Sequence, residues 1–282
     1  MISYQFCFLF DQTNHNHMKS ILLLLFSLIM TAGLSAQDFA LTQLENSPRH
    51  HEWVSVEYDG RSVHSFVVYP EVSEKAHSVI VIHENRGLTD WVRSFADQLA
   101  EAGYIAIAPD LLSGFSDEYG RTRDFPNQDA ARDALYELDP DQIILDLDAV
   151  KAYIGNDAAS TGTVVVGGFC WGGTQTFRYA TKRSDFDAAL MFYGSAPTDA
   201  DEVRNITVPV HAFYGENDQR INSGIPAIEE LMNRFENTFE YEIYKGAGHG
   251  YMRTGDDPNG SEANIAARNA SWERLKAILS GF

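Results

Sequence analysis

The order of apolar and polar residues along the chain predicts strands and helices in alternation. Eight short runs are rich in β-branched and aromatic residues or alternate between apolar and polar positions, which is typical of strands: 53–58, 63–69, 78–83, 104–108, 163–168, 188–193, 208–214 and 239–244. Five longer stretches repeat apolar residues at helical spacing: 91–102, 142–153, 173–181, 225–235 and 263–279. This alternation predicts the α/β class, with a mostly parallel twisted sheet of about eight strands and helices on both faces.

Two connections depart from simple alternation. Asp59-Gly60 joins the first two runs, and this dipeptide favours a tight turn between antiparallel strands, so we expect the sheet to begin with a hairpin. The segment 112–140 is rich in Gly, Ser, Asp and Arg and has little helical periodicity. We expect it to be a long irregular excursion over the carboxyl edge of the sheet, where such sheets bind their ligands.

The N-terminal 36 residues have the pattern of an export signal. Lys19 precedes the apolar run 21–30 and a stretch of small residues that ends at Ala36, which is typical of a cleaved secretory signal peptide. The run is too short to predict a membrane anchor. We therefore expect a periplasmic or secreted protein with a single domain over residues 37–282. Met18 directly precedes Lys19, so translation could start at Met1 or at Met18. In the second case residues 1–17 are an upstream extension that is not part of the protein.

Composition narrows the classes of partner. The 282 residues carry a formal net charge of −19, which makes nucleic acids and anionic membrane surfaces poor partners and leaves a small-molecule substrate. The sequence does not indicate which oligomeric state the protein has. His83-Glu84 has no second histidine at the spacing of a zinc motif, and the glycine-rich stretch around Gly168 has neither a phosphate-loop nor a dinucleotide pattern. We therefore expect no metal and no organic cofactor.

Cys170 is the candidate nucleophile. The other cysteine, Cys7, lies in the leader, so a free thiol remains, and a lone cysteine is often an inert core residue. Its neighbours argue against that, because Gly168-Phe169-Cys170-Trp171-Gly172 matches the strand-to-helix turn G-x-S-x-G with cysteine in place of serine. In this turn the nucleophile adopts a strained backbone, and the two glycines remove side chains that would collide. A helix N-terminus also favours a thiolate.

A nucleophile in such a turn needs an acid and then a histidine later in the chain. Asp218 follows the predicted strand 208–214, and His249 follows the strand 239–244 between two glycines, so both are expected at the same sheet edge as Cys170. Asp218 has the alternative interpretation of a loop or helix-capping residue, and Glu216 is a rival acid.

The chain resembles the dienelactone hydrolase family of α/β-hydrolases from about residue 53 to the C-terminus. The motifs that carry the resemblance are HENRGL at 83–88, APDLL at 108–112, GFCWGG at 168–173, GEND at 215–218 and GAGHGYMR at 246–253. The resemblance implies the α/β-hydrolase fold and a triad of Cys170, His249 and Asp218. It also implies that Glu84 contacts the resting thiol.

The resemblance further assigns the oxyanion hole and a substrate contact. It implies that the backbone N–H groups of Asn85 and Trp171 bind the oxyanion. Family members hold a substrate carboxylate with two arginines, of which Arg253 matches one, whereas Gly114 stands where the other belongs. One arginine therefore remains, unless Arg121 or Arg123 supplies the second guanidinium. Whether the chain has the namesake dienelactone activity stays open.

Together these features predict an exported hydrolase that opens a small ester or lactone through a thioester acyl-enzyme. Two alternatives remain open: a peptidase or acyltransferase on the same fold, and a catalytically silent binding protein. For His83 and Arg86, a core-edge histidine and a solvated arginine are the plain interpretations.

Overall fold

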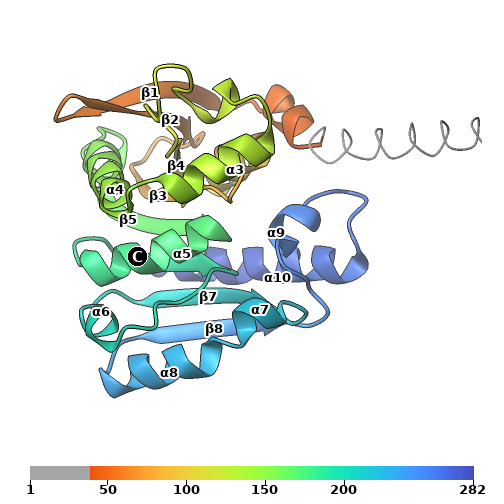
Figure 1. The fold of residues 1–282 in the computed structure, drawn as a ribbon. Coiled ribbons are helices and arrows are strands. Elements are labelled where there is room, and N and C mark those ends of the chain that lie inside the picture. Colours follow the sequence, from red (N-terminus) through yellow and green to blue (C-terminus); the bar gives the residue numbers. More distant parts are fainter. Residues whose placement is uncertain (1–38) are drawn as a thin grey trace, which may run out of the picture.

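An eight-stranded sheet lies at the centre of the molecule (Figure 1). The computed structural model describes residues 39–282, so the predicted leader, residues 1–36, lies outside the described residues. The strands are β1 (His50–Tyr58), β2 (Arg61–Tyr69), β3 (Ala76–Ile82), β4 (Ile105–Pro109), β5 (Ser160–Phe169), β6 (Ala188–Phe192), β7 (Val210–Gly215) and β8 (Phe239–Tyr244). All eight predicted strands are confirmed.

The strand order makes most of the sheet parallel. The order is β1-β2-β4-β3-β5-β6-β7-β8, in which β2 is antiparallel to β1 and β4 and all other pairs are parallel. The predicted hairpin is confirmed, and Asp59 (φ 46°) and Gly60 (φ 79°) have the two positive φ values that a type I′ turn requires. The carboxyl ends of β3 to β8 therefore meet at one edge.

Helices cover both faces of the sheet (Figure 1). The five predicted helices are confirmed as α2 (Asp90–Glu101), α4 (Pro140–Gly155), α5 (Trp171–Lys182), α8 (Ile225–Arg234) and α10 (Glu262–Leu279). Apolar side chains of α4, α5 and α8 form the core on one face, and those of α2 and α10 form the core on the other. Three short helices were not predicted: α6 (Ala200–Arg204), α7 (Gln219–Asn222) and α9 (Tyr251–Thr254).

The excursion 112–140 is more regular than the sequence predicted. It contains a 3₁₀ turn, η1 (Thr122–Asp124), and a ten-residue helix, α3 (Gln128–Glu137). The side chain of Asn127 caps α3 by accepting a hydrogen bond from the N–H group of Ala130. Only Ala131, Ala134 and Leu135 of this helix are buried, which explains why its apolar period is weak in the sequence.

Asp110 and Thr122 fix the excursion to the loop after β3. The carboxylate of Asp110 accepts hydrogen bonds from the backbone N–H of Thr122 at 2.8 Å and from its hydroxyl at 2.7 Å. The same hydroxyl accepts a bond from the N–H of Leu88 at 3.0 Å. Gly87 has φ +77°, and a Cβ there would lie 2.1 Å from the Thr122 hydroxyl, so this close approach requires glycine.

The segment before β1 is attached to α2 through a buried carboxylate. Residues 39–46 are helical and place Ala40 and Leu44 in the core layer of α2 and α10. The side chain of Asp97, fully buried on α2, accepts hydrogen bonds from Ser47, Arg49 and His51. Burial opposes the charge of Asp97, but these donors outweigh it and hold the pKa of the carboxyl below its usual range.

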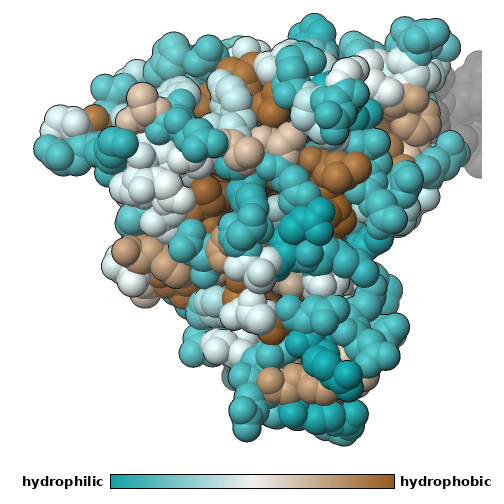
Figure 2. Space-filling model, turned by 90° about the vertical axis from the view of Figure 1, so that its left-hand side faces the viewer, coloured by the Kyte–Doolittle hydropathy of each residue, from teal (hydrophilic) through white to brown (hydrophobic). Residues whose placement is uncertain are grey.

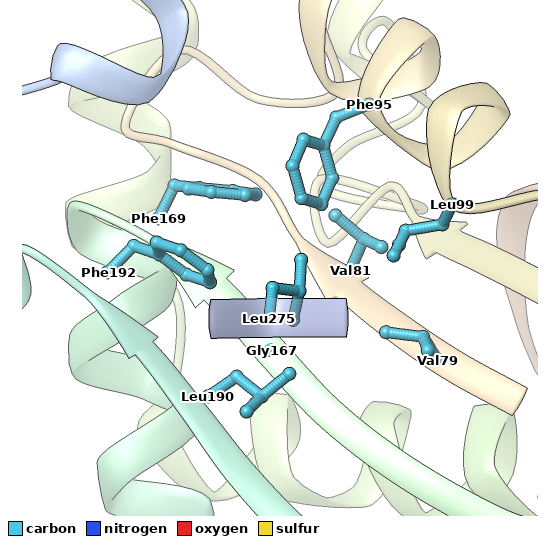
Figure 3. Close-up of a pocket in the computed structure, with 9 residues that line it drawn as sticks. All are labelled: Val79, Val81, Phe95, Leu99, Gly167, Phe169, Leu190, Phe192 and Leu275. Carbon is cyan, nitrogen blue, oxygen red and sulfur yellow. The ribbon is translucent and has the colours of Figure 1, made fainter. Parts of the chain in front are cut away.

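A small cavity lies in the core between the sheet and helices α2 and α10 (Figure 3). Its volume is about 10 Å³. The lining is apolar throughout: Val79, Val81, Phe95, Leu99, Gly167, Phe169, Leu190, Phe192 and Leu275. A space this small and apolar is a packing gap rather than a substrate site.

Polar and charged residues cover most of the face of the molecule shown in Figure 2. On the face shown in Figure 2, hydrophobic residues occur in small groups separated by hydrophilic ones. Within residues 39–282, no helix combines the length and apolar character needed to cross a membrane.

Candidate active site

The carboxyl edge of the sheet brings together residues that are far apart in the sequence. Cys170 follows β5 directly, Asp218 lies three residues after β7, and His249 lies five residues after β8. Glu84 lies two residues after β3, the neighbour of β5. Because parallel strands end at the same edge, all four side chains gather there, as the sequence predicted.

The turn at Cys170 has the strained geometry that the motif predicts. Cys170 joins β5 to α5 with φ 55° and ψ −113°, values that a non-glycine residue rarely adopts. A Cβ at Gly168 would lie 2.4 Å from the carbonyl oxygen of Gly172, and a Cβ at Gly172 would lie 2.4 Å from the carbonyl oxygens of Ile82 and His83. The predicted reason for both glycines is thus confirmed, since any side chain would collide with backbone.

Cys170, His249 and Asp218 form a continuous hydrogen-bonded chain. The Nε2 atom of His249 lies 3.1 Å from the sulfur of Cys170, and its Nδ1 atom lies 2.5 Å from Oδ2 of Asp218. Since a carboxylate only accepts, Nδ1 carries the proton and Nε2 offers its lone pair to the thiol. The Asp218 side chain is 5 % exposed and that of His249 is 34 % exposed, so the acid is shielded while the histidine remains accessible.

Glu216, the alternative candidate for the acid, contacts the backbone of another loop. Its exposed carboxylate accepts a hydrogen bond from the N–H of Gly246 at 2.8 Å. The side chain of Asn217 reinforces this contact by donating to the carbonyl of the same glycine. Glu216 therefore ties the loop after β7 to the loop that carries His249, while Asp218 contacts the imidazole.

The surroundings of Cys170 keep its thiol neutral at neutral pH. Burial, and secondly the negative charge of Glu84, raise the pKa of the thiol to about 11. The backbone N–H groups of Trp171 and Asn85 act in the opposite direction and lower the pKa. Both donors that the resemblance assigned to an oxyanion hole thus lie near Cys170.

Glu84 forms an ion pair instead of the expected direct contact with the thiol. Its carboxylate accepts a hydrogen bond from Nε of Arg253 at 2.8 Å and one from the hydroxyl of Tyr193 at 3.5 Å. The thiol of Cys170 instead bonds to His249. A guanidinium binds a nearly buried carboxylate more strongly than a neutral thiol does, which explains the choice of partner. Glu84 also raises the pKa of Arg253, which favours the charged guanidinium.

Two residues near Cys170 had no signal in the sequence. Tyr193 follows β6 with φ 39°, is fully buried, and packs edge-to-face on His249 with ring centroids 5.1 Å apart. Arg220, exposed on α7, acts through its positive charge, which lowers the pKa of Cys170. The only sequence signal that Tyr193 and Arg220 share is a position after a strand at the carboxyl edge. Many other residues have such a position, so it does not single these two out.

Two further arginines are paired with aspartates. Arg86 pairs with Asp129 on α3 at 2.6 Å, which agrees with the interpretation of a solvated arginine. Gly114 has the side chain of Arg61 as its neighbour, and this guanidinium is bound to Asp146 at 2.6 Å.

Known proteins share both the sequence and the fold of this chain. A protein of Saccharolobus solfataricus that bears the name of a carboxymethylenebutenolidase is 28 % identical over 257 residues, which cover 78 % of this chain and 95 % of the relative. A Bradyrhizobium protein named as a 2-oxo-3-(5-oxofuran-2-ylidene)propanoate lactonase is 27 % identical over 212 residues, which cover 71 % and 83 %.

A solved structure from Klebsiella pneumoniae, named as a dienelactone hydrolase, superposes with a TM-score of 0.72 at 21 % identity. The superposition covers 83 % of this chain and 99 % of that one, which establishes the α/β-hydrolase fold. The family model described as the dienelactone hydrolase family matches residues 63–282. The chain therefore belongs to the dienelactone hydrolase family, whose members are ester and lactone hydrolases.

Proposed function

We propose that this protein hydrolyses a small carboxylic ester or lactone by acyl transfer to Cys170. The observation that carries the proposal is the hydrogen-bonded chain from Cys170 through His249 to Asp218. A thiol whose pKa is about 11 is a weak nucleophile at neutral pH, so it needs a base within reach. The imidazole 3.1 Å away, with its lone pair directed at the sulfur, supplies that base.

The reaction proceeds in two acyl-transfer steps. In the first, Nε2 of His249 takes the thiol proton while the sulfur bonds to the acyl carbon, and the imidazolium then protonates the leaving alkoxide as the ester C–O bond breaks. In the second, His249 takes a proton from water and the hydroxide attacks the thioester carbon. The C–S bond then breaks as the imidazolium returns the proton to the sulfur, which releases the acid and restores the thiol. Asp218 orients the imidazole and stabilises its charged form in both steps.

Backbone groups at the nucleophile fit the charge that develops on the substrate. The N–H groups of Trp171 and Asn85 lie near the sulfur and lower the pKa of the thiol. When the carbonyl carbon is attacked, its oxygen becomes negative beside these two donors, and fixed donors of this kind stabilise the transition state. We assign them to the oxyanion hole.

Arg253 is the proposed substrate anchor. Its bond to Glu84 uses the Nε–H group, which leaves the terminal amino groups of a side chain that is 39 % exposed to meet an acidic substrate. The relatives named above act, by their names, on lactones that carry a carboxylate, which supports the same class for this chain. A single arginine predicts a modest preference for acidic substrates.

The direct test is the Cys170→Ala variant. We expect it to fold and to lose hydrolysis of p-nitrophenyl acetate and of a small lactone, and we expect iodoacetamide to inactivate the wild type with mass added at Cys170. Peptide amides serve as the comparison substrate, because faster cleavage of amides than of esters would support the peptidase alternative. Undiminished turnover by Cys170→Ala would reject the mechanism.

We further propose that the protein is exported. The proposal is supported by the pattern of Lys19, the apolar run 21–30 and the small residues up to Ala36. Mature protein from the native host should begin at or near Gln37. An unprocessed N-terminus in a cytoplasmic fraction would contradict this proposal.

A further inference from the structure

His83 is a buried titratable residue that the proposed mechanism leaves without a role. It follows β3 and is fully buried. Its Nδ1 atom lies 2.8 Å from the carbonyl oxygen of Glu84, and its Nε2 atom accepts a hydrogen bond from the N–H of Leu111, after β4, at 3.3 Å. One imidazole therefore connects the ends of two adjacent strands at the active-site edge.

The two partners determine the protonation of the ring. A carbonyl oxygen only accepts hydrogen bonds and a backbone N–H only donates, so the single proton must lie on Nδ1 and the lone pair on Nε2. Burial lowers the pKa of His83, and although the carboxylates of Asp110 and Glu84 oppose this effect, they do not reverse it. The imidazole is thus neutral, in one defined tautomer.

The hydrogen bond from His83 to the carbonyl of Glu84 fixes the orientation of the whole Glu84–Asn85 peptide. The C=O group of Glu84 and the N–H group of Asn85 belong to the same planar trans peptide and point in opposite directions. When Nδ1–H of His83 holds the carbonyl on one side, the Asn85 N–H is directed to the other side, toward Cys170, where it lowers the pKa of the thiol.

The face of the same imidazole contacts the other half of the oxyanion hole. The ring of His83 stacks on that of Trp171 with centroids 5.5 Å apart and an interplanar angle of 8°. Trp171 provides the second N–H group at the sulfur. His83 therefore touches both residues whose N–H groups face the nucleophile, by a hydrogen bond on one side and by stacking on the other.

We propose that His83 is a positioning residue that orients the Asn85 N–H group for the oxyanion by holding the Glu84–Asn85 peptide. The inference rests on the proposed acyl transfer to Cys170. Because the oxyanion forms only as the carbonyl is attacked, His83 affects kcat and leaves KM nearly unchanged.

Two substitutions separate the bonds of His83. In His83→Asn, the side-chain NH₂ takes the place of Nδ1, so it can donate to the Glu84 carbonyl while the bond from Leu111 is lost. In His83→Gln, the longer amide reaches the place of Nε2, so its oxygen can accept from Leu111 while the bond to Glu84 is lost. Each variant loses one buried hydrogen bond, so the two variants should lose similar amounts of the free energy of unfolding.

The measurement is kcat and KM for p-nitrophenyl acetate, with the rate of Cys170 alkylation by iodoacetamide as the internal control. Alkylation needs the thiol and His249 but develops no oxyanion. We expect His83→Gln to lose on the order of 10²-fold in kcat, as for a lost oxyanion-hole donor. His83→Asn should keep most of its kcat and of its alkylation rate. In His83→Gln alkylation should slow far less than kcat, because burial and Glu84 influence the pKa of the thiol more than the Asn85 N–H does. Equal kcat values in the two variants, or alkylation that falls as far as kcat, would overturn the proposal.

A measurement on the wild type covers the case in which neither variant folds. The ¹⁵N chemical shifts of the His83 ring should show a protonated Nδ1 and an unprotonated Nε2 at neutral pH. A ring protonated on Nε2 would contradict the inference. Failure of the proposed function would look different, because the wild type and Cys170→Ala would then hydrolyse the ester at equal rates whatever the tautomer of His83.

Discussion

Glu84 and Arg253 are 169 residues apart in the sequence and form an ion pair beside Cys170, with Nε and Oε2 2.8 Å apart. Glu84 lies after β3, and Arg253 lies on α9, four residues after His249. The carboxylate raises the pKa of Cys170 from a distance, while the guanidinium balances the carboxylate. This pair therefore connects the reactivity of the thiol to the residue proposed to bind the substrate.

Removing the charge of Glu84 should make the thiol more acidic. Glu84→Gln deletes a nearby negative charge that disfavours the thiolate, so the pKa of Cys170 should fall below its value of about 11. The pH profile of iodoacetamide alkylation measures this shift, which should appear as faster alkylation at mildly alkaline pH. Glu216→Gln, whose carboxylate contacts Gly246 instead, is the matched control. A profile that is the same in all three proteins would show that Glu84 does not act on the thiol.

Asp218 should be essential and Glu216 dispensable. Asp218→Asn can present an NH₂ group to Nδ1 of His249, which moves the ring proton to Nε2 and removes the lone pair from the thiol. We expect kcat to fall by roughly 10⁴-fold, as in other triads with this change. Glu216→Gln should retain kcat. If Glu216→Gln proved the more damaging variant in the ester assay, the assignment of the triad acid would be wrong.

Arg253 should confer a limited preference for acidic substrates. For a pair of esters that differ only by a carboxylate, the wild type should favour the acid in kcat/KM by about 1.5–3 kcal/mol, the contribution of one hydrogen bond to a charged group. Arg253→Ala should lose this preference. The ratio within each protein cancels any general loss of activity from leaving Glu84 unpaired. Arg86→Ala, whose partner is Asp129, should retain the preference. A wild type indifferent to the carboxylate would exclude Arg253 as the anchor.

Asp97 should set part of the acid stability of the fold. The pKa of Asp97 is lowered in the folded protein. Its contribution to the free energy of unfolding is therefore complete at pH values above its pKa in the unfolded chain, about 3.9, and is lost as the pH falls through its pKa in the folded protein. Asp97→Asn should cost about 3–5 kcal/mol of unfolding free energy near neutral pH, because Arg49 loses its buried partner.

The same variant should also flatten the decline in stability below pH 4, which urea unfolding at several pH values measures. Glu230→Gln removes an exposed pair with Arg234 and should change the free energy of unfolding by less than about 1 kcal/mol. An Asp97→Asn protein as stable as this control would show that the segment before β1 does not depend on the carboxylate.

Local patterns in the sequence determined the helices and strands and the order of the proposed triad residues along the chain. Strand and helix periods depend on neighbours within a few residues, so all eight strands and the five long helices were predictable. The same holds for the Asp59-Gly60 turn and for the glycines beside Cys170, because each follows from backbone geometry within the motif. Helix α3 was missed because it buries only three of its ten residues.

Only the tertiary structure decided how the side chains at the sheet edge are paired. The pairing of Glu84 with Arg253, the packing of Tyr193 on His249 and the two bonds of His83 join residues from different strands, and their distances depend on the whole sheet. The pKa of the thiol likewise depends on burial and on charges brought close by folding. A sequence pattern specifies which groups follow each strand, but desolvation and distance select their partners, and both exist only once the strands have assembled.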